Sequence, residues 1–141
     1  MKRISIFIMV LTTILAATNT RTESFATDNQ AKFVAYYFHT TQRCVTCRKI
    51  EALSREAIQS SFANELKNGT LVFQTVNVEE PQNRHYIQDF KLYTKSLVIT
   101  KVAGDKTERF RNLPKVWELV YSPNDFTQYV KTEISSFMTG K

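Results

Sequence analysis

Two cysteines, Cys44 and Cys47, stand three positions apart between an apolar run and a long amphipathic stretch. This arrangement restricts the fold more than any other feature of the chain. Residues 33–38 are an unbroken series of aromatic and small or branched apolar side chains, which predicts a strand covered on both faces. A short polar loop over 39–43 follows. From Cys44 to about Asn68, apolar residues recur at helical spacing, which predicts one long helix ending at Asn68-Gly69.

The rest of the chain continues the alternation of strands and helices. The expected elements are a strand over 71–78, a short helix from 81 to 90, a strand over 97–102, a tight turn over 103–106, a strand over 107–113, a helical turn or two over 114–121 and a last helix starting at 122. Strands that alternate with helices require parallel pairing through right-handed crossovers. The tight turn adds an antiparallel hairpin. The pattern therefore predicts a single α/β domain.

Length, charge and cysteine count exclude several classes of protein. A chain of 141 residues holds one domain. Two cysteines are too few for a disulfide scaffold or a Cys₄ zinc site, and the only histidines, His39 and His85, lack ligand spacing. The net charge of +6 includes Lys2 and Arg3, so roughly +4 remains from about residue 20 onward, spread over both signs. No basic block is present, and no nucleic-acid partner is expected.

The N-terminus has the pattern of an export segment. Lys2 and Arg3 precede an uncharged apolar run over 4–17 that ends in small residues, as in a secretory signal. The run is shorter than the roughly 20 residues of a usual spanning helix. Residues 1–19 are therefore expected to be a signal peptide or an N-terminal membrane anchor. Residues 20–30 are a flexible lead, and 31–141 are the domain. The protein is expected to be exported to the periplasm, and 4–17 tethers it to the inner membrane if uncleaved.

The cysteine pair carries the predicted chemistry. Cys44 would lie at the helix start, where free backbone N–H groups and the helix dipole favour an anion and lower a thiol pKa below about 8.5. Arg43 and Arg48 would add positive charge if they point toward the sulfur. Cys47 would lie on nearly the same face and could close a disulfide with Cys44. Cys44 is thus the candidate nucleophile and Cys47 the candidate resolving thiol of disulfide exchange.

Two other interpretations of the pair stay open. The first is an inert structural disulfide. The second is a non-catalytic dithiol module that captures a partner protein or a soft ion such as arsenite or copper(I), because thiolates prefer soft ions. No resident cofactor is expected, and no metal-binding residue is expected outside the cysteine pair.

The sequence resembles the thioredoxin-like superfamily over about residues 31–138. Besides the cysteine pair, the resemblance is carried by the stretches VNVEEPQN (76–83) and FKLYTKSLVI (90–99). It implies a central mixed four-stranded sheet flanked by helices, with room for an extra N-terminal strand. Within the superfamily, the combination of FHTTQRCVTCRKIE, YTKSLVI and NLPKVWELV is similar to a small exported bacterial group associated with nitroreductase or arsenic operons, the ArsF-like group.

The chain departs from the thioredoxin pattern at three places. Ser96 or its neighbours stand where the superfamily has a cis-proline, and a trans bond is expected because a non-proline cis bond costs roughly 2.5–4 kcal/mol. Arg43 replaces a tryptophan, and Phe38 replaces a buried acid. These departures favour a dedicated partner or a different redox potential over a general thioredoxin reductant. The expected supporting residues are Arg43, Thr46, Arg48, Thr94, Lys95 and Ser96.

The resemblance, together with the cysteine pair, implies an exported thiol-disulfide oxidoreductase or electron-transfer protein. It is expected to be a monomer that exchanges disulfides or electrons with a partner protein. A membrane reductant is a candidate for keeping the pair cycling, because an oxidising compartment favours the disulfide.

Overall fold

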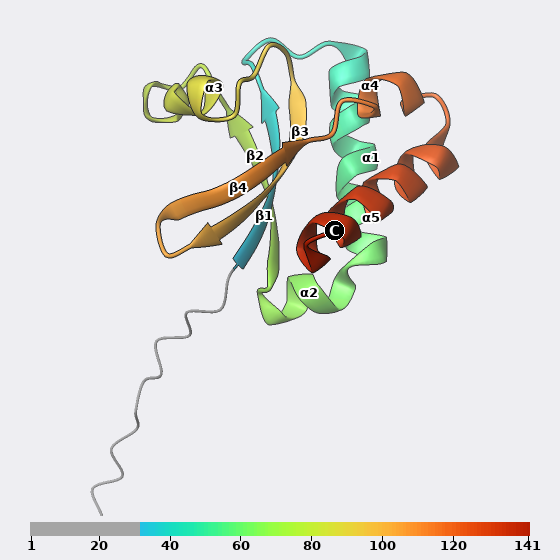
Figure 1. Ribbon diagram of the computed structural model, residues 1–141. Helices are drawn as coiled ribbons and strands as arrows, with labels where there is room; N and C mark the ends of the chain where they lie inside the picture. Colours follow the sequence, from blue (N-terminus) through green and yellow to red (C-terminus); the bar gives the residue numbers. More distant parts are fainter. Residues whose placement is uncertain (1–31) are drawn as a thin grey trace, which may run out of the picture.

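A four-stranded sheet in the order β2-β1-β3-β4 organises residues 32–141, the part of the chain that the computed structural model describes (Figure 1). The strands are β1 (Lys32–His39), β2 (Leu71–Asn77), β3 (Ser96–Ala103) and β4 (Lys106–Asn112). β1 pairs in parallel with β2 and antiparallel with β3, which pairs antiparallel with β4. The predicted mixed sheet is confirmed. An extra N-terminal strand would fall before residue 32, outside the described residues.

Helices cover both faces of this sheet, as predicted (Figure 1). One face carries α1 (Val45–Ser61), α4 (Val116–Leu119) and α5 (Pro123–Thr139). The other face carries the shorter α3 (His85–Asp89). This α/β arrangement is the one that the thioredoxin-like resemblance implies.

The core has two parts, one on each face of the sheet. Along β1, Ala35 and Tyr37 face α1 and α5, whereas Phe38 faces α3, as the two-residue period of a strand requires. On the α1 side, fully buried apolar side chains contribute about 1.5–3 kcal/mol each; they include Ile50, Ile58, Phe126 and Ile134. The smaller part consists of Phe38, Val78, Phe90 and Val98. This packing holds the start of α1 at the end of β1, where the cysteines lie.

The single helix expected over 44–68 is wrong at Phe62, where the backbone leaves the helical region with φ −132° and ψ 35°. Ser60 and Ser61 are weak helix formers, and Phe62 is buried in the larger part of the core, so the chain turns there. A second helix, α2 (Ala63–Asn68), then leads to β2. It ends at Gly69 with φ 78°, which confirms the predicted stop.

One further segment differs from the prediction, and the predicted N-terminal segments are not described by the structure. The helix expected over 81–90 is a 3₁₀ turn (Pro81–Asn83) followed by α3. Between residues 32 and 141, no helix has the length and apolar character needed to span a bilayer. The predicted export segment over 1–19 and the lead over 20–30 lie outside the described residues.

Candidate functional site

Cys44 and Cys47 form a disulfide at the start of α1, with their Cα atoms 5.0 Å apart. Cys44 is the N-cap residue, and its Sγ accepts a hydrogen bond of 3.0 Å from the Cys47 backbone N–H. Cys44 is exposed, whereas Cys47 is only 1% exposed. Cys44 therefore offers surface to an incoming thiolate, whereas Cys47 is covered by the protein.

Tyr37, on β1, holds the backbone of the buried Cys47. Its side chain has no exposed surface, and its hydroxyl donates a hydrogen bond of 2.7 Å to the Cys47 backbone carbonyl. Burial raises the pKa of Tyr37 to about 12, although the nearby charge of Arg43 opposes the rise. The hydroxyl is thus a protonated donor near neutral pH. It ties the first turn of α1 to β1.

This contact corrects the interpretation of Phe38 as the replacement for the superfamily's buried acid. Phe38 lies on the other face of the sheet, beneath α3, so it cannot act on Cys47. The β1 residue that faces Cys47 is Tyr37. The sequence did not single out Tyr37, because the neighbouring Tyr36 also carries a hydroxyl within the same run.

The two arginines beside the cysteines do not behave alike. The Arg43 guanidinium forms an ion pair with the Glu51 carboxylate, and Arg55 lies 3.4 Å from the same carboxylate. The charge of Arg43 is therefore balanced within α1 rather than offered to the disulfide. Arg48 is exposed and lines a shallow groove on the outer side of α1 together with Arg43.

The loop before Cys44 is anchored to the turn that follows β2. The Thr41 backbone N–H donates a hydrogen bond of 2.9 Å to a Glu79 carboxylate oxygen, and the Asn77 amide donates one of 3.0 Å to the Thr41 hydroxyl. The hydrogen bonds from Thr41 lower the pKa of Glu79, and the charges of Lys95 and Arg84 act in the same direction. Glu79 is therefore an exposed loop anchor.

We expect this anchor to fail in acid. A lowered pKa in the folded state means that the carboxylate stabilises the loop at every pH above the ordinary value of about 4.3, and that this is lost as the pH falls through the folded pKa. Nuclear magnetic resonance should show the Thr41 amide shift titrating with a midpoint below that value. Glu79→Gln should abolish this titration and reduce the protection of the Thr41 amide near neutral pH. An unchanged titration in Glu79→Gln would show that another group anchors the loop.

The loop that leads into β3 holds the predicted residues Thr94, Lys95 and Ser96. Ser96 begins β3 opposite Phe38, and its hydroxyl donates a hydrogen bond of 2.9 Å to the Thr94 carbonyl. The Lys95 carbonyl accepts one of 2.9 Å from the Trp117 indole N–H. Residues 32–141 contain no cis peptide bond, so the expected trans bond is confirmed. The Ser96 hydroxyl is used within its own loop.

Thr46, between the cysteines, lies next to Tyr121. The two hydroxyl oxygens are 3.5 Å apart. Tyr121 is 73% exposed, and the Lys49 ammonium lies 4.8 Å from the centre of its ring. The start of α1 thus carries an exposed aromatic ring with a cation over it.

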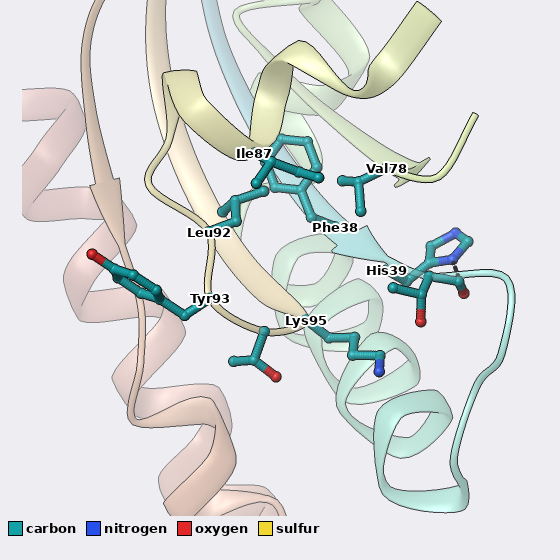
Figure 2. A pocket seen from close by; sticks show the side chains of 9 residues that line it. Phe38, His39, Val78, Ile87, Leu92, Tyr93 and Lys95 are labelled. Carbon is teal, nitrogen blue, oxygen red and sulfur yellow. Dashed lines mark hydrogen bonds between the residues drawn. The ribbon is translucent and has the colours of Figure 1, made fainter. Parts of the chain in front are cut away.

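A mainly apolar pocket of about 230 Å³ opens beside the loop that leads to the cysteines. In Figure 2, Phe38, Val78, Ile87 and Leu92 gather on one side, with His39 and Lys95 at the other end. His39 uses its ring nitrogen Nδ1 for a contact of 2.9 Å with the Thr40 carbonyl oxygen. The sequence pattern did not indicate this pocket, because its walls come from four separate segments.

Both histidines have polar partners among the described residues. Between residues 32 and 141, no three or more His, Cys, Asp or Glu side chains gather into a possible metal site. His39 is bonded within its loop, and His85 pairs with Asp89 at 2.7 Å.

Comparisons with known proteins find a distant structural similarity to a thioredoxin. No protein-family model matches the sequence, and no curated protein matches it. Oxidised thioredoxin O2 from Arabidopsis thaliana is similar at 13% identity and a TM-score of 0.41, over 72% of this chain and 82% of that chain. A malarial protein is similar at 14% identity and a TM-score of 0.39, over 72% of this chain and 96% of that chain. Because both the sequence identities and the TM-scores are low, the description of the fold depends on the strand order and helix layers observed in this chain.

Proposed function

We propose that the protein is a thiol-disulfide oxidoreductase or electron-transfer protein that works through Cys44 and Cys47. The observation that carries this proposal is the unequal exposure of the two cysteines of one disulfide at a helix N-terminus. A purely structural disulfide needs no accessible sulfur. Exchange needs one accessible sulfur for the partner and one protected sulfur for resolution.

In the reduced protein, Cys44 is the attacking group. In the disulfide form its Sγ accepts a hydrogen bond from the Cys47 backbone N–H and lies where the dipole of the 17-residue α1 favours negative charge. We expect these effects to lower the pKa of the Cys44 thiol. Arg43 adds little, because Glu51 holds its guanidinium.

The reaction proceeds in two balanced steps. The Cys44 thiolate attacks a disulfide sulfur of the partner, so a mixed disulfide forms and the partner's other sulfur leaves as a thiolate, which takes a proton from water. Cys47 then loses its proton and attacks the Cys44 sulfur, which releases the second partner thiolate and restores the Cys44–Cys47 disulfide. The partner gains two electrons and the dithiol loses two. The reverse sequence oxidises a partner dithiol.

The test is exchange with a small neutral disulfide. Reduced protein should react with 2-hydroxyethyl disulfide and release two equivalents of 2-mercaptoethanol, and Cys44→Ser should abolish the reaction. A dithiol module for soft ions predicts the opposite, namely stoichiometric arsenite or copper(I) binding without measurable exchange. Wild-type protein that stays unreactive, with a melting curve showing that it is folded, would overturn the proposal.

We further propose that the protein is exported to the periplasm and belongs with the ArsF-like bacterial group. The support is the signal-like pattern over 1–19 and the shared stretches around the cysteines. In this setting a membrane reductant or a dedicated partner protein would exchange electrons with the pair. Mass spectrometry of the protein from fractionated bacteria should find it outside the cytoplasm. Recovery of the full chain from the cytoplasm alone would refute export.

A further inference from the structure

Exposed apolar side chains gather at the end of the molecule that holds the disulfide. Val45, between the cysteines, is 78% exposed, and Tyr93, in the loop before β3, is 96% exposed. Tyr121 stands beside Thr46. A tyrosine that touches almost nothing of its own protein contributes little to stability. Large exposed apolar side chains in one region are typical of a surface that binds another molecule.

Tyr93 stands between two pockets. It lines the pocket of about 230 Å³ described above, and it also lines a second one of about 260 Å³ whose walls include Leu113, Pro114 and Trp117. In Figure 2 the Tyr93 ring turns away from Phe38, while the Lys95 side chain extends toward the His39 side. Each pocket has room for one large apolar side chain.

The charges around these two pockets have one sign. Lys95 lines the first pocket and Lys91 the second. Within residues 32–141, neither lining includes an acidic side chain. Lys95 interacts electrostatically with Glu79, but the Glu79 carboxylate already accepts a hydrogen bond from the Thr41 backbone N–H. This balance favours a partner that carries carboxylates.

A third hollow shows that this combination is not general to the surface. The groove of about 610 Å³ between α3 and the β3–β4 hairpin mixes both signs, with Asp89, Asp105 and Glu108 beside Arg109. Its lining, in which acidic side chains outnumber basic ones, does not favour an acidic ligand.

We propose that the two pockets flanking Tyr93, with Lys91 and Lys95, form a docking surface for an extended acidic segment of the partner protein. We call this the Tyr93 surface. It rests on the proposed exchange function, because the segment would carry the cysteine that reacts with Cys44. Two apolar side chains of the segment enter the pockets, and its carboxylates meet the two lysines. The substrate class is therefore a protein disulfide in an acidic, apolar sequence.

The test uses two synthetic peptides. Each carries one cysteine capped by 2-mercaptoethanol and flanked by leucines, with glutamates in one peptide and lysines at the same positions in the other. The readout is the ratio of the two reaction rates with reduced protein at low salt. This ratio cancels the intrinsic reactivity of Cys44. The wild type should prefer the acidic peptide by about ten-fold, because rim charges act mainly on the rate of encounter.

Matched variants locate the preference. Lys91→Glu combined with Lys95→Glu should bring the ratio to one or below, while Lys106→Glu, at the exposed start of β4, should keep the wild-type ratio. Tyr93→Ser should slow both peptides and leave the ratio high. A wild-type ratio near one, or an equal fall in Lys106→Glu, would overturn the Tyr93 surface. Failure of the proposed function is recognised separately, by wild-type protein that does not react with 2-hydroxyethyl disulfide.

Discussion

Replacing Cys47 by alanine is expected to stop exchange at a mixed disulfide on Cys44. The first step needs only the exposed thiolate of Cys44, whereas release of the partner needs attack by Cys47. Turnover should fall by at least about 100-fold, because no second thiol remains to complete the exchange. Non-reducing electrophoresis and mass spectrometry should find one partner thiol joined to each protein chain.

The matched control for this variant is Cys44→Ser. It keeps a thiol in the protein, but that thiol is the buried one, only 1% exposed in the disulfide form. We expect little or no mixed disulfide with it. Equal amounts of mixed disulfide in the two variants would contradict the assignment of Cys44 as the attacking group and Cys47 as the resolving group.

The second large effect concerns stability. Phe126, in the first part of α5, has no exposed surface and belongs to the core between the sheet and α1. Phe126→Ala should lower the free energy of unfolding by about 3–5 kcal/mol, because it removes a buried ring and leaves a cavity. Urea unfolding of the oxidised protein, followed by circular dichroism, measures this loss.

Two further variants make this stability result interpretable. Gln128→Ala changes an exposed position of the same helix, so it should alter stability by no more than about 0.5 kcal/mol. If Phe126→Ala does not fold, Phe126→Leu should still show a smaller loss. A Phe126→Leu protein as stable as the wild type, with no loss in Phe126→Ala, would mean that α5 does not pack on α1 as described.

Features set by neighbouring residues could be predicted from the sequence. The strand over 33–38, the helix stop at Gly69 and the tight turn over 103–106 follow from short patterns. The structure has Lys32–His39 for the strand, φ 78° at Gly69 and φ 59° at Gly104. The disulfide at a helix start belongs to the same class, because Cys44 and Cys47 are one turn apart.

Features set by tertiary contacts could not be predicted. Phe62 interrupts the helix because its ring is buried in the core, a gain that helical spacing alone does not reveal. Glu79 and Thr41 are 38 positions apart, so nothing local indicates their hydrogen bond. Tyr37 and Phe38 are both apolar strand positions, and only the packing of α1 decides which of them faces Cys47. The docking pockets likewise combine segments that are distant in the sequence.

The loop before β3 lacks a proline, so other groups hold its shape. The loop over 94–96 is fixed by the Ser96 hydroxyl and by the Trp117 indole. Its shape therefore depends on side-chain hydrogen bonds. Trp117 should be regarded as a positioning residue for Lys95, since its N–H holds the Lys95 carbonyl.

The measurement that tests the central claim most directly is the reduction potential of the Cys44–Cys47 pair. The protein is equilibrated in glutathione buffers of graded redox ratio, and the reduced fraction is found by alkylation and mass spectrometry. A working redox pair should give a potential above about −300 mV, together with exchange toward 2-hydroxyethyl disulfide. A potential well below that value, with no exchange, would identify an inert structural disulfide and contradict the proposed function.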